Sequence, residues 1–338
     1  MFVLYLIDKT LYSDYWWHRN ENPDVKKHII SKDFMVLYFK KNAGMGLTDT
    51  VGPDYALRLK HSSFFEEKHV FTCFENRAKI HLGNDDVNKD DWTVGVVIRV
   101  FRRERIAAVL TDKVSHTQRM FHDEECDMIV TGPRQGEMSE TLRYALGSNE
   151  TSPVVIIGAG SAINYIIDAL QYCAVNKVRR SNVTILYSTR DLDLFEWANE
   201  AISNLVCICE DKGLKFNLTL ACTSELEKVK EEIKTSLRLS TMMSSSVADK
   251  GPVSTTPNNF TTQRNTLRNS LWFQGLVEKS TDTVSLERTR IDLEQAIPRG
   301  STVFCQGSAG LKDAVKSVCV EKGATYYLGR GGSREDQV

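Results

Sequence analysis

One short stretch, Pro153–Leu170, constrains the fold of this chain more than any other: PVVIIGAGSAINYIIDAL. The apolar run Val154–Ile157 is typical of a buried strand, and it leads into the glycine turn Gly158–Ser161. The apolar residues that follow recur at the 3.6-residue spacing of a helix with one buried face. The pattern therefore predicts a strand, a tight turn and a helix in succession.

The glycine turn has two interpretations. A glycine turn at the start of a helix lets a diphosphate approach backbone N–H groups, where the helix dipole favours an anion. Short Gly-x-Gly turns also occur in strand–turn–helix units that bind nothing. From this stretch alone, both interpretations of Gly158, Gly160 and Ser161 stay open.

The rest of residues 151–338 repeats the alternation of strand and helix, which predicts a doubly wound parallel sheet. The stretch at about 239–269 is rich in Ser, Thr and Asn and has almost no apolar periodicity, so we interpret it as a disordered insertion. The further strands are predicted at Val183–Tyr187, Leu214–Leu220, Thr302–Cys305 and Ala324–Leu328.

Residues 24–150 differ in character, because short apolar strands alternate with turn signals. Such a pattern indicates an antiparallel β-barrel or sandwich. A short helix is predicted at Ser115–Phe121. The strands are predicted at Val36–Phe39, Tyr55–Leu59, His69–Thr72, Trp92–Arg99 and Cys126–Val130.

Composition excludes several function classes. The 43 Lys and Arg nearly balance the 44 Asp and Glu, so no general attraction to nucleic acid is expected. The 8 Cys and 7 His form no CxxC, HxxxH or HExxH pattern, so we expect no metal site. Scattered cysteines also argue against a disulfide framework and fit reduced thiols in the cytosol.

The N-terminal segment 1–23 is apolar for only a few residues, far short of the ~20 needed to span a bilayer. It lacks the basic start and small-residue cleavage site of a signal peptide. Two interpretations stay open: the last turns of a membrane helix with aromatic residues at the interface, or an amphipathic helix packed on the body.

Arg190 follows the second predicted strand of the parallel sheet. An arginine at this position can pair with an adenosine 2′-phosphate, which favours NADP over NAD. The alternative is a surface ion pair with Asp191 or Asp193.

The order of these motifs resembles the ferredoxin–NADP reductase superfamily. Within it, the chain most resembles the cytosolic dehydrogenase region of NADPH oxidases, dual oxidases and ferric reductases. His69–Thr72 resembles the family's His-Pro-Phe-Thr flavin motif, and Phe195–Trp197 after an arginine is the most family-specific piece. Five further segments resemble the family more weakly. FVLYLIDKTLY resembles the exit of the last membrane helix, VVIRV resembles a His-Ile-Arg strand, and SHTQRMF resembles the start of a helix. VTGPRQGE resembles a Gly-Pro turn, and VFCQGSAGL resembles a Cys-Gly-Pro motif.

The resemblance implies which residues hold cofactors. FAD would lie on the barrel of residues 24–150, and NADPH on the sheet of residues 151–338. Cys305 would lie beside the nicotinamide carbon that gives up hydride. The implied FAD residues are His69, Phe71, Thr72, Arg99 and Thr117, and the implied NADP residues are Gly158, Gly160, Ser161, Arg190, Arg290 and Gly307.

The resemblance also implies an activity: hydride transfer from NADPH to FAD, then single-electron transfer to haem or another acceptor. Superoxide or hydrogen peroxide would form only with a membrane haem domain, so the expected location is the cytoplasmic side of a membrane. Two alternatives stay open. One is a soluble flavin reductase. The other is a catalytically eroded regulatory or binding module, because Val70, Ala162, Tyr165 and Gln306 depart from the family pattern.

Overall fold

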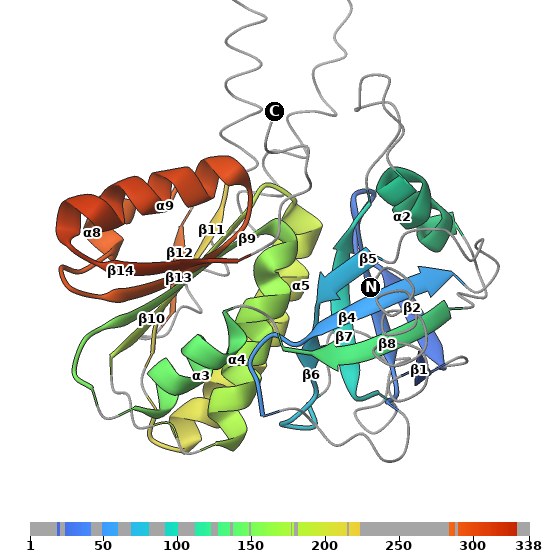
Figure 1. Cartoon of the computed structure of the whole chain (residues 1–338), viewed down its shortest axis with the longest axis horizontal. Coiled ribbons are helices and arrows are strands. Elements are labelled where there is room, and N and C mark those ends of the chain that lie inside the picture. Colours follow the sequence, from blue (N-terminus) through green and yellow to red (C-terminus); the bar gives the residue numbers. More distant parts are fainter. Residues whose placement is uncertain are drawn as a thin grey trace, which may run out of the picture.

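The computed structural model describes residues 19–20, 24–41, 49–59, 69–80, 92–100, 112–122, 128–135, 138–148, 150–176, 178, 182–214, 216–223, 284–287 and 290–329. The insertion predicted at about 239–269, and all of segment 1–23 except residues 19–20, lie outside them. Within the described residues there are one parallel sheet and two antiparallel sheets. Figure 1 shows the parallel sheet on the left and the antiparallel strands on the right, with helices between them.

The parallel sheet has the strand order β12-β11-β10-β9-β13-β14, which confirms the prediction of a doubly wound sheet. β12 was not predicted, because its four residues, VSLE, include only two apolar ones. The strands are β9 (Val154–Ala159), β10 (Val183–Thr189), β11 (Phe216–Cys222), β12 (Val284–Glu287), β13 (Thr302–Gln306) and β14 (Thr325–Leu328).

Helices cover both faces of this sheet (Figure 1). Alternate residues of β9 face opposite ways, so Val154 and Ile156 pack with α4 (Ile163–Val175) and α5 (Leu192–Asp211). Val155 and Ile157 pack in the cluster that α9 (Ala309–Lys322) supplies from the other side. The short helix α8 (Leu293–Ala296) precedes β13. The two-sided burial explains why β9 is a continuous apolar run.

The antiparallel strands form two four-stranded sheets, β1-β8-β4-β5 and β2-β3-β7-β6. One apolar cluster lies between them, with Leu37, Leu57 and Val96 among its fully buried members. The predicted barrel is confirmed. Its strands are β1 (Arg19–Asn20), β2 (Val25–Ile29), β3 (Phe34–Phe39), β4 (Asp54–Leu59), β5 (His69–Thr72), β6 (Phe74–Glu75), β7 (Val94–Arg99) and β8 (Met128–Arg134).

Two helices accompany the barrel strands in the chain. α2 (Asp112–His122) is longer than the helix predicted at Ser115–Phe121, and Lys27 Nζ donates to the carbonyl of Phe121 at its end, at 3.1 Å. α3 (Ser139–Gly147) was not predicted. It precedes the domain boundary predicted at residue 150, yet its Leu142 and Leu146 pack in the cluster of the parallel sheet. That boundary stays a prediction.

A single apolar cluster joins the barrel to the parallel sheet. β3 is buried along its whole length. Its Val36 and Tyr38 belong to the same cluster as the residues of α4 and α5, whereas its intervening residues face the barrel interior. Phe74 of β6 meets Trp197 of α5, with ring centroids 6.5 Å apart.

α4 also presents polar side chains to the barrel, although every residue from Ile163 to Ala174 is buried. Asn164 Oδ1 accepts from the Val97 amide at 2.7 Å, and its Nδ2 donates to the Val97 carbonyl at 2.9 Å. Gln171 Oε1 accepts from the Ala78 amide at 2.7 Å. Asn164, Asp168 and Gln171 are spaced four and three residues apart, so they share one face of the helix.

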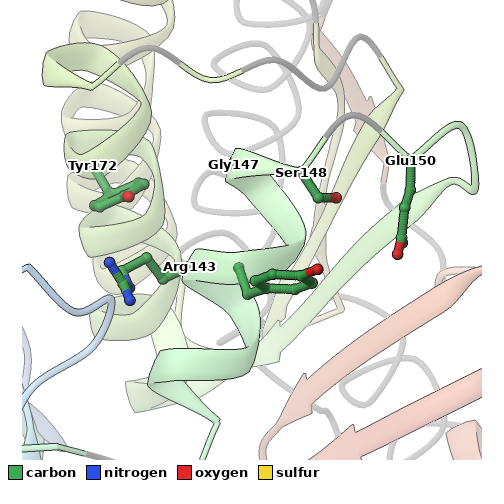
Figure 2. A pocket seen from close by; sticks show the side chains of 6 residues that line it. Arg143, Gly147, Ser148, Glu150 and Tyr172 are labelled. Carbon is green, nitrogen blue, oxygen red and sulfur yellow. The ribbon is translucent and has the colours of Figure 1, made fainter.

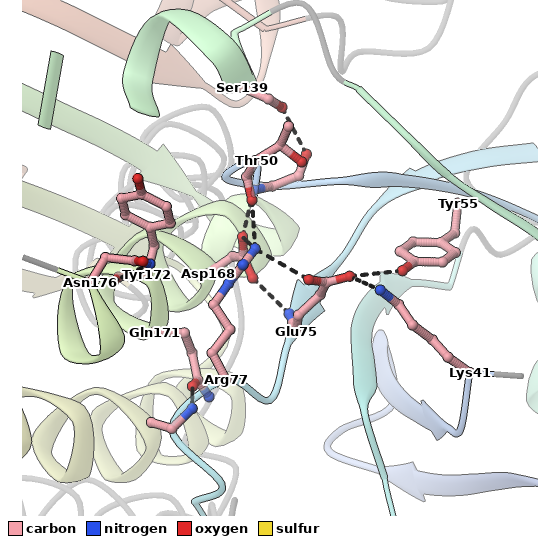
Figure 3. Close-up of polar contacts among 12 residues, drawn as sticks. Lys41, Thr50, Tyr55, Glu75, Arg77, Ser139, Asp168, Gln171, Tyr172 and Asn176 are labelled. Atoms are coloured by element: carbon pink, nitrogen blue, oxygen red, sulfur yellow. Dashed lines mark hydrogen bonds and ion pairs between the residues drawn. The ribbon is translucent and has the colours of Figure 1, made fainter. Parts of the chain in front are cut away.

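Asp168 is the centre of a buried charge network (Figure 3). Its two oxygens accept from the amides of Gly52 and Glu75, each at 2.6 Å, and from Arg77 Nη2 at 3.2 Å. Burial raises the pKa of Asp168, while the Arg77 guanidinium opposes the shift. Arg77 also lies 3.3 Å from Glu75, whose other oxygen accepts from Lys41 and from the Tyr55 hydroxyl.

We expect Asp168→Ala to lower the free energy of unfolding by about 3–5 kcal/mol, because it removes one of the two carboxylates beside the buried Arg77 guanidinium and leaves two buried amides unpaired. Urea unfolding followed by circular dichroism measures the change. Asp313→Ala, an exposed position on α9, is the matched control and should stay within about 0.5 kcal/mol. Equal stability of the two variants would contradict the role assigned to the network.

Candidate functional site

The strand order of the parallel sheet marks one position for a ligand. The chain runs outward from β9 through β10, β11 and β12, and then returns to β13 on the other side of β9. Open α/β sheets bind ligands beyond the carboxyl ends of the strands at such a reversal. The position falls at the ends of β9 and β13, where Gly158 and Gln306 lie opposite one another in the register.

The glycine turn after β9 is shaped for a ligand. Gly160 has φ +58°, a left-handed conformation that favours glycine. A Cβ placed on it would come within 4 Å of one other atom, Phe34 Cζ at 3.9 Å, so the backbone is open here. Tyr187 steadies the turn by donating from its hydroxyl to the Gly160 carbonyl at 3.0 Å. Ser161 follows in the single 3₁₀ turn that opens α4.

Gly158 and Gly307 serve close packing instead. A Cβ on Gly158 would lie 2.8 Å from Ile166 Cδ1, so glycine lets α4 approach β9. A Cβ on Gly307 would lie 3.4 Å from the Ala159 Cβ. The structure therefore brings the predicted residues Gly158, Gly160, Ser161 and Gly307 together at one edge of the sheet.

Two departures from the family pattern lie away from the open face of this turn. Ala162 is 5% exposed and Tyr165 is 2% exposed. The Tyr165 ring fills the space beside Gly52, where a Cβ would come within 2.4 Å of it. Both side chains are therefore buried, and Tyr165 contributes to the contact between helix and barrel.

Thr72 meets the end of β13 from the barrel side. Its hydroxyl donates to Asp54 Oδ1 at 2.9 Å and accepts from Gln306 Nε2 at 3.2 Å. Burial raises the pKa of Asp54, and the bond from Thr72 opposes that shift. Thr72 ends β5, which is the terminal strand of its sheet, and His69 and Phe71 on the same strand are half-buried. The strand that resembles a flavin motif is thus in contact with the reversal point.

Cys305 lies deeper than its predicted role suggests. Its side chain is fully buried in the cluster with Val315 and Cys319 of α9. Burial raises the pKa of its thiol to about 12, so the thiol is protonated at neutral pH. Its place beside a nicotinamide carbon stays a prediction.

The remaining predicted residues are spread around this edge. Arg99 of β7 is exposed and pairs in register with Phe34 of β3. Phe34 Cζ would lie 3.9 Å from a Cβ placed on Gly160, so Arg99 lies near the glycine turn. Thr117 is buried within α2 of the barrel. Arg190 and Arg290 are exposed and follow the carboxyl ends of β10 and β12.

Asp191, named above as an alternative partner of Arg190, has other bonds. Its Oδ1 accepts from the Leu194 amide at 2.9 Å and caps α5. Its Oδ2 accepts from the Ser31 hydroxyl of the barrel at 2.7 Å. The carboxylate therefore ties the start of α5 to the barrel.

A surface hollow of about 580 Å³ lies at the other edge of the sheet (Figure 2). Arg143 and Tyr144 of α3 and Tyr172 of α4 line it together with residues 147, 148 and 150, which precede β9. Arg143 pairs with the exposed Asp49 at 2.6 Å. The hollow contains none of the predicted site residues, so we assign the candidate site to the carboxyl edge.

Within the described residues, no group of three metal-ligating side chains gathers to hold an ion. None of the helices that the structure describes combines the length and the apolar character needed to cross a membrane.

Two solved structures share this fold. A flavohemoglobin from Malassezia yamatoensis, with bound FAD and heme, shares 17% identity over 97% of this chain and 64% of its own, with a TM-score of 0.51. The chain thus spans less than two thirds of that protein. The CS-b5R domains of human Ncb5or, in the NAD+ form, share 10% identity over 95% of this chain and 71% of theirs, with a TM-score of 0.50.

No protein-family model and no curated protein matches the chain. The structural likeness establishes the class of fold, an antiparallel barrel followed by a doubly wound parallel sheet. At these identities the likeness shows the fold alone and does not single out the NADPH oxidases or ferric reductases.

We expect Cys305 to react with a maleimide at neutral pH at least about a hundredfold more slowly than the exposed Cys207, because the thiolate is the reactive form and burial suppresses it. Peptide mapping by mass spectrometry after timed labelling measures both rates. Labelling in urea is the control and should equalise them. Rapid labelling of Cys305 in the folded chain would contradict its enclosed position.

Proposed function

We propose that the chain is an NAD(P)H-dependent flavin reductase module. The observation that carries the proposal is the contact between the two candidate cofactor surfaces: Gln306, at the reversal point of the parallel sheet, donates to Thr72 of the barrel at 3.2 Å. A hydride donor on the sheet and an acceptor on the barrel would therefore meet at this junction. Holding two reactants in contact is a large part of what such a protein contributes.

The nucleotide fits the sheet side. The open backbone at Gly160 and the start of α4 would hold a diphosphate, since both place N–H groups toward an anion. Arg190 would meet the adenosine end from β10, and Arg290 from β12. A 2′-phosphate on that end would make NADPH the preferred donor, because a guanidinium pairs with phosphate through two parallel hydrogen bonds.

The flavin fits the barrel side along β5. His69, Phe71 and Thr72 are each half-buried on the terminal strand, so they present surface to a flat ring without leaving the fold. FAD would supply the acceptor of a two-electron hydride and the donor of single electrons. Thr72 would orient the ring after its hydroxyl exchanges its bond to Asp54 for one to the flavin. Arg99 would face the diphosphate end.

We extend the proposal to a haem acceptor held outside residues 24–150 and 151–338. The flavohemoglobin with the same fold carries both FAD and heme, and this chain spans 64% of its length. Together with the resemblance to NADPH oxidases and ferric reductases, this favours a membrane haem domain as the partner, with this chain at the cytoplasmic side of that membrane. Superoxide or hydrogen peroxide would then require that partner.

A second candidate, a nucleotide-binding module without flavin chemistry, is favoured by one observation. The single proton of the Thr72 hydroxyl points to Asp54, and its oxygen accepts from Gln306. The residue that would orient a flavin is therefore satisfied by the protein itself. Flavin content separates the two candidates.

We expect the purified chain, after incubation with FAD and gel filtration, to retain flavin absorbance that NADPH bleaches in the absence of oxygen. Gly160→Val should keep the flavin but bleach at least about tenfold more slowly, because a side chain closes the turn to the nucleotide. Gly213→Val is the matched control, since Gly213 also has positive φ but lies at the end of α5. A chain that retains no flavin would favour the binding module.

We expect Arg190→Ala to weaken NADPH binding about tenfold to a hundredfold and to leave NADH binding nearly unchanged, because a charge-assisted bond to the 2′-phosphate is lost. Isothermal titration with each nucleotide measures the two affinities. Arg143→Ala, beside the hollow at the opposite edge, should change neither. An equal loss for NADPH and NADH would contradict the phosphate role.

A further inference from the structure

Gln306 Oε1 is one of several buried side-chain polar atoms that have no hydrogen-bond partner among the described residues. Gln306 ends β13 and lies opposite Gly158, so the atom is beside the glycine turn. Buried acceptors are almost always paired in folded proteins. An unpaired one at a reversal point therefore indicates where a donor group of a ligand binds.

The side-chain amide of Gln306 is held in one orientation by its nitrogen. Thr72 donates its one proton to Asp54, because a carboxylate can only accept. The Thr72 oxygen must then accept from the amide, which makes Nε2 the atom that faces it at 3.2 Å. The other atom of the amide, Oε1, is consequently turned away from Thr72.

The stem of Gln306 is fixed as well. Gly329 follows β14, and its amide donates to the Cys305 carbonyl at 2.9 Å. A Cβ placed on Gly329 would lie 3.4 Å from Gln306 Cγ, so the backbone there passes close to the stem. With both ends held, Oε1 is an acceptor whose position is set before a ligand arrives.

We propose that Gln306 Oε1 accepts a hydrogen bond from the carboxamide N–H of a bound nicotinamide dinucleotide, and that Gln306 is thereby a specificity-determining residue. The inference rests on the proposed function, since it names the group that the same site recognises. A primary carboxamide carries two N–H donors on a planar ring substituent. The diphosphate of the same ligand would lie on the Gly160 turn at the end of the neighbouring strand β9.

The test compares NADPH with its acetylpyridine analogue, whose acetyl group keeps the carbonyl but lacks the N–H. Isothermal titration on the full chain measures both affinities without turnover. We expect NADPH to bind at least about tenfold more tightly, because the analogue leaves a buried acceptor unpaired. Gln306→Leu should weaken NADPH about tenfold, leave the analogue within about twofold and bring the ratio close to one.

Gln295→Leu, an exposed glutamine on α8, is the matched control and should keep the ratio of the natural chain. Equal affinities of the natural chain for NADPH and the analogue would overturn the inference and leave the proposed function standing. The inference would also be overturned if Gln306→Leu left the ratio of the NADPH and analogue affinities unchanged. The same holds if Gln306→Leu changed the affinity for FAD alone. No binding of either dinucleotide would overturn both proposals. If the Gln306→Leu variant does not fold, the affinities of the natural chain for NADPH and for the analogue test the inference.

Discussion

The buried carboxylate of Asp168 is the constraint on which the arrangement of the two halves depends. A charge removed from water must be paired, and α4 supplies no cation of its own for this purpose. The barrel supplies Arg77 and the amides of Gly52 and Glu75. The helix that begins at the glycine turn is therefore fixed against the barrel by bonds that neither half can make alone.

Local pattern was sufficient to predict five of the six strands of the parallel sheet, all but β12. β9 and α4 follow from apolar periodicity, because each buries a face whose spacing is visible in the chain. The polar face of α4 was missed, although Asn164, Asp168 and Gln171 stand out as polar residues at helical spacing in an apolar helix. Their partners lie 67 to 116 residues away, so the sequence shows the polar positions but not what they contact.

The candidate site likewise contains residues whose place could be predicted from the sequence and a contact that could not. Gly160 and Arg190 could be predicted because each follows a strand of the parallel sheet, and parallel strands bring their carboxyl ends to one edge. The hydrogen bond between Gln306 and Thr72 could not be predicted, because 234 residues separate the two in the sequence. From the sequence, Gln306 was visible only as a departure from a glycine. The structure gives that departure a position and an unpaired acceptor.

The burial of α4 from Ile163 to Ala174 also limits how this fold can be recombined. A different reductase barrel joined to this parallel sheet would meet three polar side chains that need specific backbone amides at Val97, Gly52, Glu75 and Ala78. An apolar surface at that contact would leave them unsatisfied. A chimaera would therefore have to exchange α4 together with the barrel, which makes the barrel plus this helix the transferable unit.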